Sequence, residues 1–199
     1  MTNSSLINPQ ILILLFIGSA IMLSGQSNVD EHTQIKVMTF NILGGRNTDG
    51  NMDLDKVAKV ISDADPDFVF MQEVDFRVNR SRKLDLTLEL GCRTGMIPTF
   101  ARAMYYDGGE YGEGLLSKYS LISMRNLALP FVQNEEPRAA LEIVVELVGG
   151  DTIVMVGTHL AHEGPEGRLL QTRELVDTYK RSRYPTILVG DLNAEPVSE

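Results

Sequence analysis

Short apolar or alternating runs recur along the chain, and several of them end in a polar residue. A run of this kind predicts a strand whose side chains are buried, with the polar residue at its exposed end. The strands predicted to end in this way cover residues 35–41, 68–73, 152–159 and 187–191, and their last residues are Asn41, Glu73, His159 and Asp191. An isolated Gly-Asp-x-Asn segment such as residues 190–193 is more often a simple turn. The segment at residues 190–193 is a candidate site because three other predicted strands also end in a polar residue.

Alternation also predicts further strands in the middle of the chain, over residues 99–105, 115–117, 121–124 and 138–148. Glycine-rich residues 107–114 predict a loop. The strand at 138–148 has a clear apolar face, made of Leu141, Ile143, Val145 and Leu147. A Gly-Gly-Asp turn then leads into residues 152–159, and the two strands are expected to form a hairpin.

Helical spacing appears in three places. Apolar residues at Leu54, Val57, Ala58 and Ile61 follow a capping residue, Asp53, and predict a helix. A second helix is predicted after Gly167, with one side made of Leu169, Thr172, Val176 and Tyr179. Residues 77–91 are ambiguous, because four leucines alternate as in a strand while leucine and glutamate favour a helix that Gly91 would end.

The first part of the chain differs from the rest. Residues 11–23 are almost wholly apolar and no lysine or arginine precedes Lys36. The run is short for a membrane helix, which needs about 20 apolar residues, but it suits the core of a secretion signal. We therefore expect residues 1–27 to be a signal peptide and the protein to be exported, to the periplasm or the extracellular space. An uncleaved membrane anchor is the alternative.

Composition and net charge indicate which classes of binding partner are favoured. The 199 residues are 43% hydrophobic and 23% charged, as in an ordinary globular domain. The net charge of −9 disfavours tight binding to a polyanion, for which lysine and arginine supply most of the affinity. Two basic groups, one at residues 77–83 and one at 180–183, are interpreted as solvated surface. Cys92 is the only cysteine, so no internal disulfide can form.

The residues at and just after the strand ends have a shared chemistry. Asn41 and Glu73 offer oxygen ligands that suit Mg²⁺, with Mn²⁺ also possible. His159 and Asn193 can donate hydrogen bonds to a phosphate, and Asp191 can orient or deprotonate an attacking water. Together they predict phosphoester hydrolysis. A zinc site of His159, His162 and Glu163 is disfavoured, since the histidine spacing of helical zinc hydrolases is absent.

Five segments, in this order and spacing, resemble the endonuclease/exonuclease/phosphatase superfamily, which has the deoxyribonuclease I-like fold. They are Thr39-Phe-Asn-Ile42, Gln72-Glu-Val74, Leu115-Leu-Ser-Lys118, Thr158-His-Leu160 and Gly190-Asp-Leu-Asn193. The resemblance implies an α+β protein: a four-layer α/β/β/α sandwich of two mainly antiparallel sheets, over residues 34–199. It favours a helix at 82–90.

The resemblance also implies roles for individual residues. Asn41 and Glu73 match the metal ligands, and His159, Asp191 and Asn193 match the catalytic set. The histidine that His159 matches contacts the scissile phosphate or protonates the leaving group in many members. Arg138 and Tyr111 are expected to contact the substrate. The substrate is expected to be a phosphate ester of unknown class; nucleic acid is possible but not favoured by the charge, and no obligate protein partner is evident.

One motif of the family is not found in this sequence. The family ends in a Ser-Asp-His segment after further strands, whereas the last histidine here is His162. We therefore expect a domain incomplete at its C-terminus, with the last strands missing and sheet edges exposed. The alternative function is a binding or interaction protein that keeps the fold without the chemistry.

Overall fold

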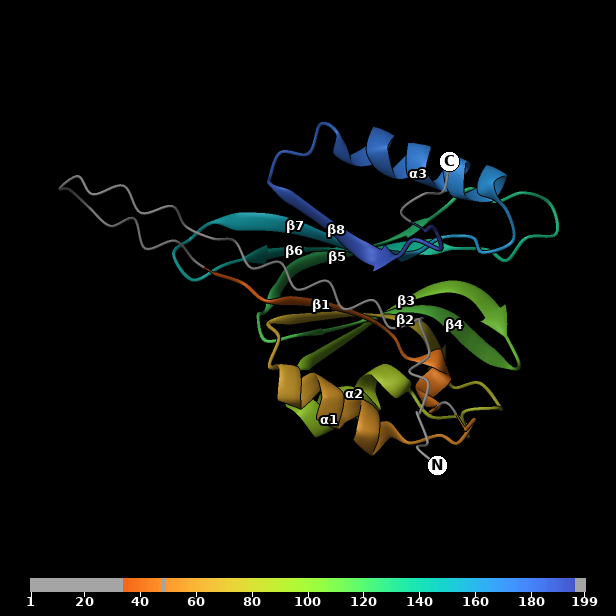
Figure 1. The fold of residues 1–199 in the computed structure, drawn as a ribbon. Helices are drawn as coiled ribbons and strands as arrows, with labels where there is room; N and C mark the ends of the chain where they lie inside the picture. Colours follow the sequence, from red (N-terminus) through yellow and green to blue (C-terminus); the bar gives the residue numbers. More distant parts are fainter. Residues whose placement is uncertain (1–33, 48, 196–199) are drawn as a thin grey trace, which may run out of the picture.

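A computed structural model describes residues 34–47 and 49–195. Within this part the chain folds into four layers: two helices, a four-stranded sheet, a second four-stranded sheet and a third helix (Figure 1). The predicted α/β/β/α sandwich is thereby confirmed. The proposed signal peptide, residues 1–27, and residues 196–199 lie outside the described residues.

The first sheet has the strand order β1-β2-β4-β3. Its strands are β1 (Val37–Asn41), β2 (Phe68–Phe76), β3 (Ile97–Tyr106) and β4 (Gly109–Ser117). β1 and β2 are parallel, and the other neighbours are antiparallel. The carboxyl ends of β1 and β2 therefore reach the same edge of the sheet.

The second sheet has the order β5-β6-β7-β8 and repeats this arrangement. Its strands are β5 (Leu121–Ala128), β6 (Ala139–Glu146), β7 (Thr152–His159) and β8 (Thr186–Asp191). β6 and β7 form the predicted antiparallel hairpin, whereas β7 and β8 are parallel. The ends of β7 and β8 therefore also lie together, with His159 paired to Asp191 in the register.

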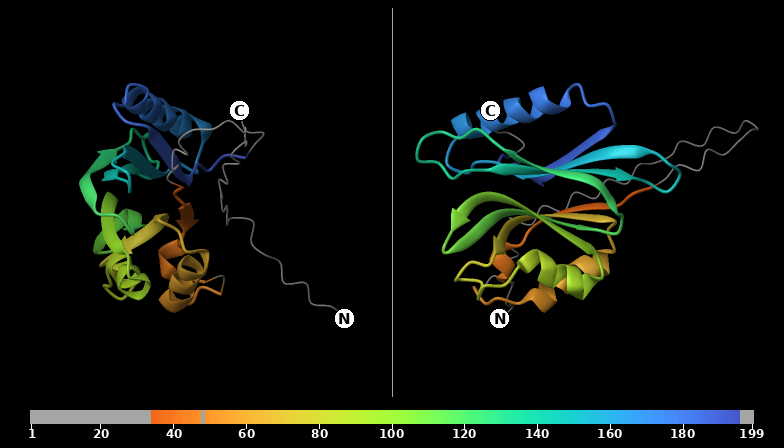
Figure 2. Two further views of the ribbon diagram at one scale, coloured as in Figure 1. Left: turned by 90° about the vertical axis from the view of Figure 1, so that its left-hand side faces the viewer. Right: turned by 180° about the vertical axis from the view of Figure 1, so that it is seen from behind.

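The helices cover the outer faces of the two sheets (Figure 2). α1 (Leu54–Ala64) and α2 (Leu86–Thr94) pack on the first sheet, and α3 (Pro165–Tyr179) packs on the second. Aspartate side chains cap the first two helices, since Asp53 accepts from the Lys56 amide and Asp85 from the Leu88 amide. A short 3-10 turn, Leu43–Gly45, follows β1.

The central core lies between the two sheets. Phe68, Phe70 and Leu115 from the first sheet meet Leu141 and Met155 from the second, all fully buried. Close approach of the sheets depends on Gly157 of β7, because a Cβ there would lie 2.0 Å from the Phe70 ring. The predicted inward face of β6 is confirmed, with Leu141, Ile143 and Val145 fully buried.

Two local predictions are wrong in their boundaries. Residues 109–114 belong to strand β4 rather than to a loop, and the turn is confined to Asp107 and Gly108, which both have positive φ. The glycines of β4 allow tight packing, since a Cβ on Gly112 would lie 2.1 Å from the Ala101 carbonyl oxygen. The helix expected at 82–90 is shifted to Leu86–Thr94, where it passes through Gly91 and ends at Gly95 in a left-handed conformation.

In α3, the side that carries Leu169, Thr172, Val176 and Tyr179 is not the buried side of the helix. Leu169 and Val176 are 50% and 56% exposed, whereas Gly167, Gln171 and Leu175 are buried. The reason is the position of β8 at the edge of its sheet within the described residues. The helix overhangs this edge, so that the side with Leu169 and Val176 lines a groove next to Leu188.

Within residues 34–47 and 49–195, no helix is both long and apolar enough to cross a membrane.

Candidate active site

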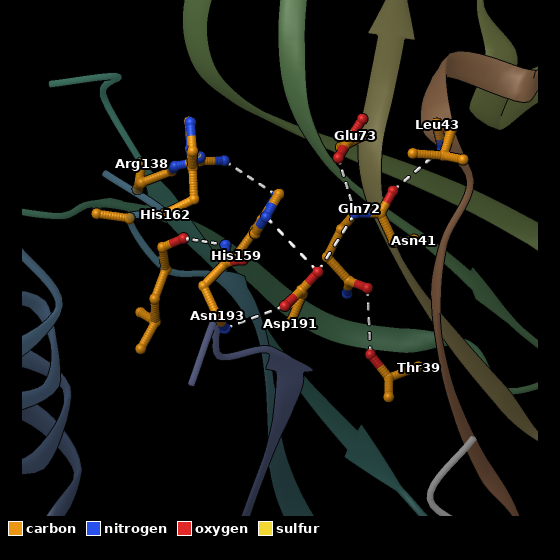
Figure 3. Close-up of polar contacts among 12 residues, drawn as sticks. Thr39, Asn41, Leu43, Gln72, Glu73, Arg138, His159, His162, Asp191 and Asn193 are labelled. Carbon is orange, nitrogen blue, oxygen red and sulfur yellow. Dashed lines mark hydrogen bonds and ion pairs between the residues drawn. The ribbon is translucent and has the colours of Figure 1, made fainter. Parts of the chain in front are cut away.

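The predicted polar strand ends meet at one edge of the sandwich (Figure 3). Asn41 ends β1, whereas Glu73 lies inside β2, which continues to Phe76 and does not end at Glu73 as predicted. His159 ends β7 and Asp191 ends β8 in the second sheet. The site is therefore assembled from both sheets, and its two halves are joined by a contact between Asn41 and Asp191, which are 150 positions apart.

Oxygen-bearing side chains form one half of the site. The Nδ2 atom of Asn41 donates to Glu73 Oε1 at 2.8 Å and to Asp191 Oδ2 at 3.3 Å. The Oδ1 atom of Asn41 accepts from the Leu43 amide at 3.1 Å. The carboxylates of Glu73 and Asp191 thus both accept from the Asn41 amide group. A cation bound next to them would reduce the repulsion between their two negative charges.

This donor set suits a hard divalent cation. The described residues contain no group of three or more histidine, cysteine or acidic side chains that could hold a metal by themselves. Mg²⁺ does not require one, because it commonly binds to one or two carboxylates and completes its shell with waters and substrate oxygens. Glu73 and Asn41 therefore fit Mg²⁺ or Mn²⁺ better than a cation that needs a full protein cage.

The backbone at Glu73 is unusual for a strand. β2 carries a bulge between Met71 and Val74, where its register with β4 shifts. Glu73 lies in the bulge with a φ of +57°, a left-handed conformation that costs energy for a residue with a side chain. A bulge changes the direction of a side chain relative to the sheet, and this one is located at the site.

Asp191 and Asn193 form a turn as well as a polar pair. The Asn193 amide donates to Asp191 Oδ1 at 3.0 Å, and Asn193 Nδ2 donates to the Leu160 carbonyl at 2.8 Å. The glycine before them permits this geometry, because a Cβ on Gly190 would lie 1.9 Å from the Thr158 carbonyl oxygen. The turn therefore fixes both side chains against the end of β7.

His159 is held in one tautomer. Its Nδ1 atom lies 3.0 Å from Arg138 Nη1, and a guanidinium can only donate, so Nδ1 accepts and the ring proton is on Nε2. Nε2 lies 3.7 Å from Asp191 Oδ2. Burial, with 4% of the residue exposed, and the neighbouring Arg138 charge lower the pKa of His159 to about 4. The imidazole is neutral at neutral pH.

Arg138 organises the second half of the site. It is 3% exposed and sits just before β6. Besides His159, its guanidinium reaches His162 Nδ1 at 3.1 Å from Nη2 and Glu136 Oε1 at 3.0 Å from Nη1. The guanidinium contacts the Nδ1 atoms of both imidazoles, which argues against a zinc ion bound through these two atoms.

Tyr111 lies beside the site on β4 and is buried. Its ring packs on Tyr106, with centroids 5.9 Å apart, and the Arg80 guanidinium lies 5.5 Å from its centroid. Burial, followed by the nearby charges of Glu73 and Glu136, raises the pKa of the Tyr111 hydroxyl above its usual range. The hydroxyl therefore stays protonated.

Two acidic residues near the site were not singled out from the sequence. Asp75 is fully buried and pairs with Arg80 through two contacts, Nε to Oδ2 at 2.9 Å and Nη2 to Oδ1 at 2.7 Å. For Arg80 this corrects the interpretation of the basic group as solvated surface, whereas Arg77, Arg82 and Lys83 are exposed. The position of Asp75, two residues after Glu73 in the same strand, is the signal that could have revealed it.

The second of these residues is Glu113 on β4. Strand alternation places it on the same face as Tyr111 and Leu115, which turns it toward the space between the sheets. It is 3% exposed and its Oε2 atom has no hydrogen-bond partner. Burial, opposed in part by Arg138, holds the pKa of the carboxyl well above its usual range. Assigning residues 109–114 to a loop hid this residue.

Comparison with known proteins identifies the family of this chain. A family model described as the Endonuclease/Exonuclease/phosphatase family matches residues 38–199. No curated protein sequence matches the chain significantly.

Solved structures share the fold at low identity. An endonuclease/exonuclease/phosphatase from Beutenbergia cavernae is 24% identical with a TM-score of 0.70, over 83% of this chain and 50% of that one. The human Nocturnin catalytic domain with bound sulfate is 23% identical with a TM-score of 0.63, over 83% and 66%. A mannosyl-6-phosphatase from Bacteroides thetaiotaomicron is 16% identical with a TM-score of 0.61, over 81% and 66%. The chain thus spans between half and two thirds of these structures.

Proposed function

The chain belongs to the Endonuclease/Exonuclease/phosphatase family, and from this membership we propose that it is a metal-dependent phosphoester hydrolase. In the proposed reaction, water attacks a phosphate bound next to a divalent cation. One observation carries the proposal: an amide and an acid from the first sheet meet His159, Asp191 and Asn193 from the second. The side-chain oxygens of the first sheet can bind a cation. The N–H groups of His159 and Asn193 on the second sheet can donate hydrogen bonds to an anionic phosphate.

Asn41 and Glu73 are the residues that would hold the cation. When bound, Mg²⁺ or Mn²⁺ would neutralise phosphate charge and polarise a phosphoryl oxygen. Glu73 supplies the negative charge and lies in the strained bulge of β2. The Asn41 amide would have to release its contacts with Glu73 and Asp191 to turn its oxygen toward a metal.

The residues of the second sheet would act on water and phosphate. Asp191 is placed to orient the attacking water or to accept its proton. The His159 Nε2–H group can donate a hydrogen bond to a phosphate oxygen, because Arg138 fixes the ring proton on Nε2. Asn193 uses one amide hydrogen on the Leu160 carbonyl and keeps a second for the phosphate.

The substrate class is proposed from charge and from the relatives. The net charge of −9 favours a small phosphate ester over a long nucleic acid. One solved relative is named as a mannosyl-6-phosphatase, and another carries a sulfate, an anion with the shape of phosphate. Both support a compact phosphate site in this chain.

The proposal is tested by hydrolysis of bis(4-nitrophenyl) phosphate and 4-nitrophenyl phosphate. We expect turnover with Mg²⁺, loss of turnover in EDTA, and recovery when Mg²⁺ is restored. Asp191→Asn should lower the rate by about 10²–10⁴-fold, the usual contribution of a positioned acid or base. Asp177→Asn, at an exposed position of α3, is the matched control and should leave the rate unchanged.

Turnover that persists in EDTA or in Asp191→Asn would contradict the proposal. If phosphate and Mg²⁺ bind but no ester is hydrolysed, the alternative of a non-catalytic binding protein is selected instead.

We also propose that the protein is exported, since the apolar run at residues 11–23 matches a secretion signal in length and is followed by small residues. Fusing residues 1–33 to a reporter that is active only outside the cytoplasm tests this. Reporter activity is expected, and it should be lost when two leucines of the run are replaced by arginine. A reporter that stays inactive with the native segment would refute export.

A further inference from the structure

Tyr106 and Tyr111 lie on the face of the first sheet that carries the site. Met104 of β3 pairs with Tyr111 of β4, and Tyr106 follows Met104 by two residues, so strand alternation gives both tyrosines the same face. Leu115, four residues after Tyr111, packs in the core between the two sheets, which identifies this face as the inner one. The two rings lie 5.9 Å apart, and Tyr106 is 39% exposed. Tyr106 therefore presents a partly open aromatic surface on the side of the site.

Arg80 covers both rings and keeps hydrogen-bond donors that its contacts do not use. Its guanidinium carbon lies 4.6 Å from the ring centroid of Tyr106 and 5.5 Å from that of Tyr111. Nε and Nη2 donate to Asp75, and Nη1 donates to the Tyr106 hydroxyl at 3.4 Å. A guanidinium has five N–H groups, so two remain beyond these contacts within the described part of the chain, and 26% of the side chain is exposed. The Tyr106 hydroxyl accepts from Arg80 and still has its own hydrogen to donate.

This surface is within reach of the proposed cation site. Asp75 follows Glu73 by two residues in β2, a rise of roughly 7 Å at most. Asp75 pairs in the register with Tyr111, and the charge of Glu73, after burial, raises the pKa of the Tyr111 hydroxyl, so this carboxylate lies near the ring. A substrate whose phosphate lies next to Glu73 can therefore extend its leaving group over Tyr111 to Arg80 and Tyr106.

The chemistry of this surface favours a neutral ligand with hydroxyl groups. Arg80 is paired with the buried Asp75 through two contacts, so the pair has no net charge to attract a second anion. A purely apolar leaving group would leave the remaining N–H groups without acceptors. Sugar hydroxyls can accept from Arg80 and from the Tyr106 hydroxyl, and the C–H groups of a sugar ring can pack on the aromatic face.

We propose that Arg80 and Tyr106 form a subsite for the leaving group, and that this leaving group is a sugar. The substrate is accordingly a sugar phosphate, with its phosphate next to Glu73 and His159 and its sugar ring on Tyr106. This inference rests on the proposed function, because the subsite acts on a substrate whose phosphate is already held at the site.

The same hairpin contains a matched control. Tyr105 is 73% exposed and pairs with Arg102, whose guanidinium carbon lies 4.1 Å from the Tyr105 ring centroid and whose Nη1 donates to the Tyr105 hydroxyl at 2.7 Å. Tyr105 pairs in the register with Glu110, the residue before Tyr111, and so lies on the opposite face of the sheet. Each face of the hairpin thus has an arginine–tyrosine pair, and only the pair with Tyr106 is on the side of the site.

The test measures binding and needs no turnover. The probes are the 6-phosphonates of glucose, mannose and galactose, in which carbon replaces the ester oxygen, together with ethylphosphonate and benzylphosphonate. Isothermal titration calorimetry with Mg²⁺ gives their affinities for wild type, Tyr106→Ala and Tyr105→Ala. Arg80 is left unchanged because its loss would expose the buried Asp75 carboxylate to a missing partner.

We expect at least one hexose phosphonate to bind wild type about tenfold or more tightly than ethylphosphonate, as two or three hydrogen bonds with a charged donor among them would give. This ratio of affinities should fall to about twofold or less in Tyr106→Ala and keep its wild-type value in Tyr105→Ala. Both variants replace an exposed side chain, so both should fold.

The other outcomes separate this inference from the function on which it rests. If wild type binds the hexose phosphonates no better than ethylphosphonate, if the two variants change the ratio equally, or if benzylphosphonate binds more tightly than every hexose phosphonate, the sugar subsite is refuted and the hydrolase proposal stands. The same holds if no phosphonate binds but the nitrophenyl esters are hydrolysed. If no phosphonate binds and no ester is hydrolysed, both proposals fail.

Discussion

At the scale of single residues, the site combines groups whose charges are set by burial. Arg138 is a permanent cation held between a neutral imidazole and the carboxylate of Glu136. Glu113 is buried, its Oε2 atom has no hydrogen-bond partner, and burial holds the pKa of its carboxyl well above its usual range. Glu73 and Asp191 are the carboxylates that a cation would meet at the site.

The state of Glu113 gives a pH-dependent prediction. Below the pKa of an unfolded glutamate, about 4.3, the folded and unfolded chains are both protonated at this position. As pH rises, the unfolded chain loses the proton and the folded chain keeps it, so that stability falls toward the raised folded pKa. Glutamine cannot lose a proton. Glu113→Gln should therefore become more stable relative to wild type as pH rises from 4 to 8.

Melting temperatures of the two proteins across this range provide the check. A constant difference, or one that shrinks as pH rises, would show that Glu113 is ionised in the folded protein.

At the level of elements, an ion pair with a buried carboxylate joins the segment between β2 and α2 to the wall of the site. Asp75 is fully buried, and Arg80 covers it while stacking on Tyr106 at 4.6 Å. Removing one partner of a buried pair leaves the other without compensation. Arg80 thereby connects the 77–84 segment to Tyr111 and to the wall of the site.

Arg80→Gln should lower the free energy of unfolding by about 3 kcal/mol, because it leaves the fully buried Asp75 carboxylate without its charged partner. Urea denaturation measures the loss. Glu110→Gln is the matched control, since it removes a partly exposed pair with Arg102 in the adjacent hairpin and should cost less than about 1 kcal/mol. Equal losses in the two variants would refute a special role for the Asp75 pair.

Elements with one strong signal could be predicted from the sequence. The first helix was defined by its apolar spacing and by Asp53, which caps it as expected. The β6–β7 hairpin followed from alternation and a glycine turn. These signals are local: a few neighbouring residues determine the burial pattern, and the fold retains it.

Elements whose structure depends on distant neighbours could not be predicted. β4 contains glycines because β3 lies close to it, and composition alone made this segment look like a loop. Which side of α3 is buried depends on the position of β8, which is the edge strand of its sheet within the described residues. The bulge at Glu73 and the contacts of Arg138 with His159 and His162 likewise depend on tertiary structure. The types of residue at the site were visible in sequence, but their mutual orientation was not.

At the scale of the whole molecule, charge determines which phosphate esters can approach. The chain has 18 basic and 27 acidic residues, and Arg80 and Arg138 near the site are paired with Asp75 and Glu136. Because lysine and arginine supply most of the affinity for a polyanion, binding of this acidic chain to duplex DNA should be weak.

We expect a dissociation constant for a short DNA duplex weaker than about 10⁻⁴ M near physiological salt, with little dependence on salt concentration. Fluorescence anisotropy at several salt concentrations measures both. Micromolar binding with a steep salt dependence would contradict the preference for a small substrate.

The central claim is that a divalent cation held by Glu73 makes the two-sheet site hydrolytic. The most direct measurement is the initial rate of bis(4-nitrophenyl) phosphate hydrolysis as Mg²⁺ is titrated into wild type and Glu73→Gln. Glu166→Gln, at an exposed position in the first turn of α3, is the control. We expect a saturating rate for wild type and the control, and an affinity for Mg²⁺ about 100-fold weaker in Glu73→Gln. Identical titration curves for wild type and Glu73→Gln would show that Glu73 does not hold the cation.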